Sequence, residues 1–108
     1  MARVLLNVPK TARRGEVIEI RILIAHPMES GQRRADTGGL VPRQIINQFT
    51  CTYNGVEVLS LELHPAIAAN PYFAFYARAD ASGPIVLSWV DDAGVSQTEM
   101  AELGVLLG

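Results

Sequence analysis

The chain has 108 residues, of which 49% are hydrophobic and 19% are charged, and its formal net charge is −2. This length fits one domain with a single core, spanning residues 1–108. The charges form no basic stripe that could follow a phosphate backbone, so nucleic acid is not an expected partner. The apolar stretches are far shorter than the ~20 residues of a membrane-spanning helix, and we expect a water-soluble protein without membrane contact.

Seven segments show the alternation of apolar and polar residues that is typical of half-buried strands. The clearest spans residues 16–25, where Ile18, Ile20, Ile22 and Ile24 share one face. Residues 45–53 and 56–63 flank Asn54-Gly55, which predicts a two-residue hairpin turn. The remaining predicted strands span residues 3–8, 72–78, 84–90 and 95–101.

These segments predict an all-β fold, an immunoglobulin-like antiparallel β-sandwich of about seven strands. The intradomain disulfide of antibody domains is excluded because Cys51 is the only cysteine. Residues 65–71 are predicted to form a short helical turn between the sheets. Residues 27–43 exceed the ~12–15 residues above which a structureless loop is usually functional or disordered, and we expect partner contacts there.

No catalytic residue, cofactor or metal site is predicted. Cys51 alternates with Phe49 and Tyr53, which favours a buried thiol over a reactive one. His26 and His64 each precede a proline, and no Cys/His cluster completes a closed zinc site around them.

Three other polar features have simple structural interpretations. Gly38-Gly39 lacks the lysine and the helix of a nucleotide-binding loop and predicts a hinge or turn. Asp91-Asp92 is interpreted as a solvated hairpin end rather than a cation site. The charged residues of the long loop form either an interaction surface or a solvated loop, and the sequence favours neither; they are Glu29, Arg33, Arg34 and Arg43.

Several sequence blocks, in the same order, resemble proteins of the SoxZ family. The two most specific blocks run from His26 to Arg33 (HPMESGQR) and from Phe49 to Gly55 (FTCTYNG). The resemblance covers residues 3 to about 101 and leaves out residues 103–108. The other blocks are PKTA and GEVIEI near the N-terminus, PRQIIN, ANPY, and WVDDAG near the C-terminus.

This resemblance implies a role in the Sox pathway of thiosulfate and sulfur oxidation. In that pathway a SoxY subunit carries sulfur intermediates on the cysteine of a C-terminal Gly-Gly-Cys-Gly-Gly arm. The present chain ends in Gly104-Val105-Leu106-Leu107-Gly108 without cysteine. The resemblance therefore implies a non-catalytic subunit, without cofactor, that binds SoxY to form the SoxYZ carrier complex and meets other Sox enzymes through it.

The same resemblance implies a periplasmic location, reached in complex with a partner that carries a twin-arginine signal. Arg13-Arg14 is followed by Glu16, Glu19 and Arg21, where such a signal requires an uncharged hydrophobic region. We therefore expect the chain to carry no export signal of its own.

Binding to such a subunit is expected to bury an apolar centre. The expected contacts are apolar residues outside the predicted core and charged residues of the long loop: Val17, Leu23, Met28, Arg33, Arg43, Val56 and Val58. Without its partner, this surface would let the isolated chain form a homodimer.

Two other functions remain open at this stage. One is an immunoglobulin-like binding module unrelated to sulfur metabolism, which would bind a different partner. The other is a small cysteine-dependent enzyme, which requires an accessible Cys51.

Overall fold

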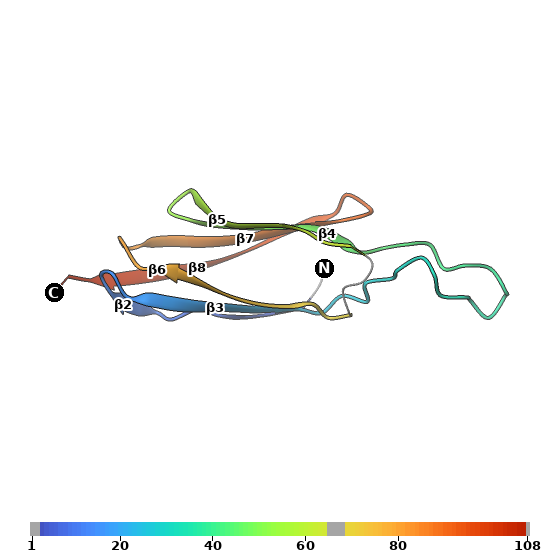
Figure 1. The fold of residues 1–108 in the computed structure, drawn as a ribbon, viewed down its shortest axis with the longest axis horizontal. Coiled ribbons are helices and arrows are strands. Elements are labelled where there is room, and N and C mark those ends of the chain that lie inside the picture. Colours follow the sequence, from blue (N-terminus) through green and yellow to red (C-terminus); the bar gives the residue numbers. More distant parts are fainter. Residues whose placement is uncertain (1–2, 65–68, 108) are drawn as a thin grey trace.

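The computed structural model describes residues 3–64 and 69–107 and confirms the all-β, immunoglobulin-like sandwich (Figure 1). Two sheets face each other, of three and five strands. The smaller sheet has the order β1-β3-β6 and contains β1 (Val4–Asn7), β3 (Val17–Ile24) and β6 (Tyr72–Arg78). The larger has the order β2-β8-β7-β4-β5 and contains β2 (Thr11–Arg13), β8 (Ser96–Leu106), β7 (Gly83–Asp91), β4 (Ile46–Tyr53) and β5 (Val56–Glu62).

The described residues form eight strands, one more than the seven segments found in the sequence. The strand that was missed is β2, which has only three residues and is too short to show a period. Pro9 lies between β1 and β2, where the N-terminal segment passes from one sheet to the other. Because β2 pairs in parallel with the end of β8, the sandwich is not purely antiparallel, and β8 continues to Leu106 instead of ending at Ala101.

The predicted helical turn falls largely on residues 65–68, which lie outside the described residues. In the part of the chain that is described, no helix has the length and apolar character needed to cross a membrane.

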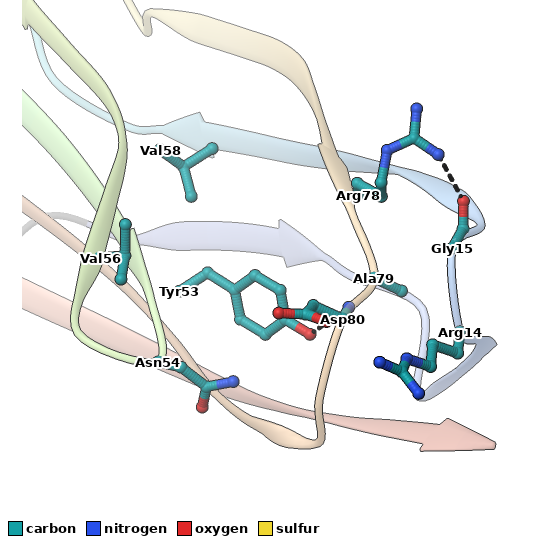
Figure 2. Close-up of a pocket in the computed structure, with 9 residues that line it drawn as sticks. All are labelled: Arg14, Gly15, Tyr53, Asn54, Val56, Val58, Arg78, Ala79 and Asp80. Atoms are coloured by element: carbon teal, nitrogen blue, oxygen red, sulfur yellow. Dashed lines mark hydrogen bonds between the residues drawn. The ribbon is translucent and has the colours of Figure 1, made fainter. Parts of the chain in front are cut away.

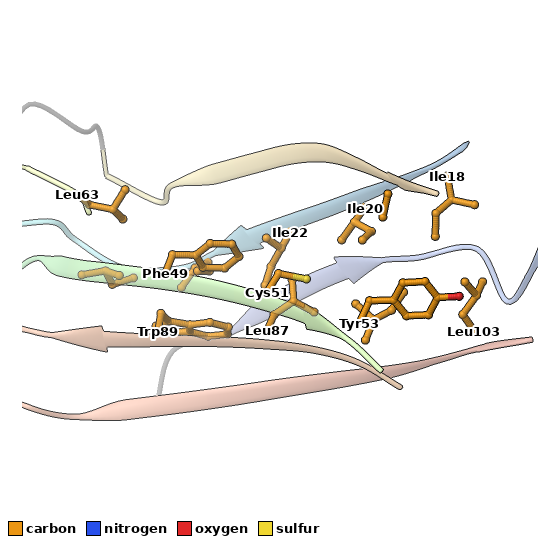
Figure 3. Packing of buried hydrophobic residues seen from close by; sticks show 14 of the residues in the cluster. Ile18, Ile20, Ile22, Phe49, Cys51, Tyr53, Leu63, Leu87, Trp89 and Leu103 are labelled. Carbon is orange, nitrogen blue, oxygen red and sulfur yellow. The ribbon is translucent and has the colours of Figure 1, made fainter. Parts of the chain in front are cut away.

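The core lies between the two sheets and is built from the residues whose alternation predicted the strands (Figure 3). The four isoleucines of β3 are all buried. Phe49 of β4 is fully buried, and its ring stacks on Phe73 at a centroid distance of 4.7 Å and on Trp89 at 6.4 Å. Burial of these large apolar side chains is the main stabilising contribution to such a sandwich.

The predicted hairpin turn is confirmed at Asn54-Gly55, where both residues have positive φ, 51° and 79°. β4 and β5 pair on either side of it, with a register shift between Cys51 and Thr52. Asparagine and glycine are the residues that adopt this left-handed conformation at least cost.

The long connection is more ordered than the sequence suggested. Antiparallel bridges join Glu29 to Gln44 and Arg34 to Leu40, so residues 27–43 fold back on themselves as a narrow projection. We call it the projecting hairpin. It extends to the right in Figure 1, away from the C-terminus, and the molecule measures 63 × 20 × 18 Å.

Candidate partner-binding site

The structure does not bring the seven predicted contact residues together on one surface. Val17 and Leu23 point outward from the three-stranded sheet, and Val56 and Val58 line a hollow at the β4–β5 turn. Arg33 and Arg43 belong to the projecting hairpin, and both are exposed.

Met28, the seventh residue, is part of the core and not of the surface. Its side chain is 5% exposed, and its Sδ accepts a hydrogen bond from the backbone N–H of Ile46 at 3.3 Å. The backbone N–H of Met28 donates to Nδ1 of His26 at 2.9 Å. The prediction of an exposed contact at Met28 is therefore corrected, because the chain turns inward where the projecting hairpin begins.

Leu23 lies in an apolar row across the outer face of the three-stranded sheet. The strand register places Leu5 on one side of it and Tyr72 on the other. Leu5 is 71% exposed and Tyr72 is 57% exposed. Sequence reasoning missed both residues, although Leu5 lies within a predicted strand and Tyr72 begins another. Val17 lies at the other end of β3, opposite Arg78.

A hollow of about 450 Å³ opens beside the β4–β5 turn (Figure 2). Val56 and Val58 form its apolar wall, and Arg14, Arg78 and Asp80 also line it. Arg78 donates a hydrogen bond to the carbonyl oxygen of Gly15 at 2.8 Å, which holds its guanidinium at the rim.

Asp92 anchors the base of the projecting hairpin. Its carboxylate accepts two hydrogen bonds from Arg43, at 2.8 and 3.0 Å, one from Asn47 at 3.0 Å and one from the backbone N–H of Ile45 at 3.1 Å. These bonds, led by the one from Arg43, lower the pKa of Asp92 well below its ordinary value. Asp92 therefore has a structural role. Its partner Arg43 helps to hold the projecting hairpin in place within this chain.

The stability of the fold at low pH depends on the ionisation of Asp92. Because the native pKa is depressed, the ionised form stabilises the fold above the ordinary value of 3.8, and this contribution is lost as pH falls below it. Asp92→Asn should lower the melting temperature at pH 7, measured by circular dichroism. The difference in melting temperature between the variant and the wild type should shrink as the pH falls from about 4 to about 2, because the wild-type carboxylate becomes protonated there. Asp36→Asn, in an exposed position near the tip, is the control. A deficit that is constant with pH would contradict the assignment.

Two of the segments that resemble SoxZ proteins, HPMESGQR and ANPY, meet at the same end of the sandwich. Asn70 Oδ1 accepts a hydrogen bond from the backbone N–H of His26 at 3.1 Å, and the backbone N–H of Asn70 donates to the carbonyl oxygen of His26 at 2.7 Å. Segments far apart in the sequence thus hold the base of the projecting hairpin. His26 is fixed as a hydrogen-bonding residue of this turn.

Cys51 is fully buried on the inner face of β4, as the alternation predicted. Burial raises the pKa of its thiol to about 11. In the register it lies between Leu59 of β5 and Leu87 of β7. A protonated thiol that is closed off from solvent is a poor nucleophile.

We expect Cys51 in the folded protein to resist alkylation by iodoacetamide at pH 8, since the thiol is both protonated and buried. Addition of denaturant should restore the reactivity of a free cysteine, which mass spectrometry measures as the fraction alkylated with time. Rapid modification of the folded chain would show an accessible thiol and would favour the cysteine-enzyme alternative.

Among residues 3–64 and 69–107, no three His, Cys, Asp or Glu side chains gather closely enough to hold a metal ion. Asp91 instead stabilises its own turn, because its carboxylate accepts hydrogen bonds from the backbone N–H groups of Ala93 and Val95 at 2.9 and 3.0 Å.

The fold places this chain among the small immunoglobulin-like β-sandwich proteins. Its family follows from the sequence, because a model of the family described as sulphur oxidation protein SoxZ matches residues 6–102. The chain belongs to the SoxZ family of sulfur oxidation proteins. A comparison with curated proteins found no match.

Solved structures with the same fold have very different sequences. The superoxide reductase (neelaredoxin) from Ignicoccus hospitalis is similar with a TM-score of 0.72 and 13% identity, over 97% of this chain and 82% of that chain. The sulfur carrier protein SoxY from Chlorobium limicola f thiosulfatophilum is similar with a TM-score of 0.66 and 12% identity, over 95% of this chain and 78% of that chain. At this identity the similarities show the fold alone.

Proposed function

We propose that this chain is the non-catalytic subunit of a sulfur-carrier complex and that it binds a SoxY-like subunit whose C-terminal cysteine carries the sulfur intermediates. The observation that carries the proposal is the SoxZ family match over residues 6–102 in a chain whose one thiol is fully buried. The similarity to a SoxY structure supports a pair of related sandwiches.

The position of Cys51 supports the division of labour between the subunits. A carrier thiol must reach several active sites in turn, which requires a mobile tether. Cys51 lies within β4, which is hydrogen-bonded to strands on both sides. It cannot leave the core without unfolding the sheet, so the carrier thiol comes from the partner and this chain provides a rigid support.

The location that goes with this function is the periplasm, with the chain exported together with its folded partner. Expression of the chain with and without a SoxY-like partner that has a twin-arginine signal tests this point. Periplasmic recovery only in the presence of the partner is the expected result, and equal recovery in its absence would contradict co-export.

The binding proposal is tested by coexpressing the chain with the SoxY-like protein of the same genome. Size-exclusion chromatography with mass detection should show a stable complex with equal numbers of the two subunits. Two separate peaks from folded proteins would overturn the proposal and favour a binding module that is unrelated to sulfur metabolism.

A further inference from the structure

The outer face of the five-stranded sheet has a row of small hydroxyl side chains across its centre. The strand register aligns Ser60 of β5, Thr50 of β4, Ser88 of β7 and Thr98 of β8. Thr50 alternates with buried core residues, so the row points away from the core.

In the rows on either side, the positions on β4, β7 and β8 are also uncharged, whereas β5 contributes a glutamate to each row. On one side lie Thr52, Val86 and Met100, and Met100 is 61% exposed. On the other side lie Gln48, Val90 and Ser96. We call these three rows the neutral face. Four adjacent strands contribute to it, of which β5, β4 and β7 lie along the upper layer in Figure 1.

Two pairs of polar side chains on the neutral face are hydrogen-bonded to each other. Gln48 Nε2 donates to Ser60 Oγ at 3.0 Å, and the hydroxyls of Ser88 and Thr98 are 3.3 Å apart. Polar groups that already have a partner cost less free energy when water is removed from them. The neutral face can therefore be covered by another protein at a low desolvation cost.

The outer face of the three-stranded sheet is different. Its middle carries Glu19 and Arg21, which form an ion pair at 3.4 Å, and Tyr76 donates a hydrogen bond to Glu19 at 3.2 Å. Such charged side chains are typical of a sheet that faces water. Depletion of charge is the compositional feature of the centre of a protein interface, and the five-stranded sheet has it.

Acidic side chains lie at the margin of the neutral face. Glu62 and Glu57 of β5 lie beside Gln48 and Thr52 in the register. Glu102 of β8 is two residues after Met100 and faces the same side of the sheet. Arg13 of β2 lies farther away, beside Leu106. A complementary surface would have an uncharged centre and basic residues at its edge.

We infer that the neutral face binds the SoxY-like subunit, through a sheet face of that subunit with an uncharged centre and a basic margin. This inference rests on the proposed function and adds the surface and its chemistry. Two sheet faces made of small side chains pack at ~10 Å, which gives a continuous contact between two sandwiches.

Arginine substitutions at the centre of the neutral face test the inference. Thr50→Arg and Thr98→Arg should each weaken binding of the SoxY-like subunit by roughly 100-fold or more, because a charge would be buried without a partner. Isothermal titration calorimetry with the purified subunits measures the change. Thr98 is exposed in the isolated chain, so its substitution keeps the test valid if Thr50→Arg fails to fold.

Ala74→Arg is the matched control, because it places the same charge on the exposed outer face of the three-stranded sheet. It should leave the affinity unchanged. If wild-type protein binds and Thr98→Arg binds equally well, the neutral face is not the interface, although the proposed function stands. If folded wild-type protein does not bind at all, both are overturned. A homodimer broken by Thr98→Arg, with unchanged partner affinity, would also overturn the inference.

The acidic margin is tested by replacing Glu57, Glu62 and Glu102 together with lysine. Attraction between an acidic and a basic margin accelerates association and is screened by salt. The triple variant should associate roughly 10-fold more slowly at low salt, and its rate should rise with salt where the wild-type rate falls, measured by stopped-flow fluorescence. A rate that is unchanged or higher would overturn the predicted basic margin.

Discussion

Phe49→Ala is expected to lower the free energy of unfolding by about 3–5 kcal/mol. The ring is fully buried between the sheets and contacts Phe73, Phe75 and Trp89, with centroid distances of 4.7, 6.2 and 6.4 Å. Truncation removes apolar burial and leaves a cavity that the surrounding side chains close only in part. Since a domain of this size has about 5–15 kcal/mol in all, the variant should be close to the limit of folding.

Urea denaturation followed by tryptophan fluorescence measures this effect, because Trp89 stacks on the same ring. Leu5→Ala is the control for loss of an apolar side chain at an exposed position, and its change should stay within about 0.5 kcal/mol. Similar losses for the two variants would show that Phe49 is not the centre of the core.

Tyr53→Phe is expected to cost about 1–3 kcal/mol although it removes a single oxygen atom. The hydroxyl of this buried residue accepts hydrogen bonds from the backbone N–H groups of Asp80 and Ala81, at 3.0 and 3.1 Å, and donates to the carbonyl oxygen of Ala81. It joins β4 to the connection between β6 and β7, and Figure 2 shows it beside Asp80 among the residues that line the hollow. The substitution leaves the backbone N–H groups of Asp80 and Ala81 without this acceptor, while the carbonyl oxygen of Ala81 keeps its hydrogen bond from Asn54 Nδ2.

Tyr76→Phe is the matched control, because its hydroxyl bonds to the exposed carboxylate of Glu19. That variant should change the midpoint of thermal unfolding little, since water replaces the lost partner. If both variants melt together with the wild type, the hydroxyl of Tyr53 does not hold the connection in place.

The strands and the core were predictable because the core-facing residues alternate. The four isoleucines of β3 identify a buried face without any knowledge of its neighbours. β2 could not be found in this way, because Thr11–Arg13 is too short for a period and is defined by its parallel pairing with β8. The order in the projecting hairpin likewise depends on distant contacts, above all Arg43 with Asp92.

The candidate interface was harder to predict from the sequence. Met28 was expected on the surface because it lies in a loop, but the backbone turns its side chain toward Ile46. The neutral face joins the β4–β5 pair to the β7–β8 pair, and β4 and β7 are adjacent in the sheet but not consecutive in the chain. Single strands show that Thr50 and Ser88 face outward, whereas an uncharged surface becomes visible only once the strand order is known.

Sulfur transfer in a reconstituted system tests the central claim, that this chain supports a carrier whose thiol belongs to the partner. Thiosulfate-dependent electron transfer would be measured with the purified Sox enzymes and the SoxY-like subunit in three reactions. The first lacks this chain, the second contains the wild-type chain and the third contains the Cys51→Ala variant. We expect activity to require the chain and to survive the substitution. Loss of activity with a folded Cys51→Ala variant that still binds its partner would contradict the claim, because it would give the buried thiol a chemical role.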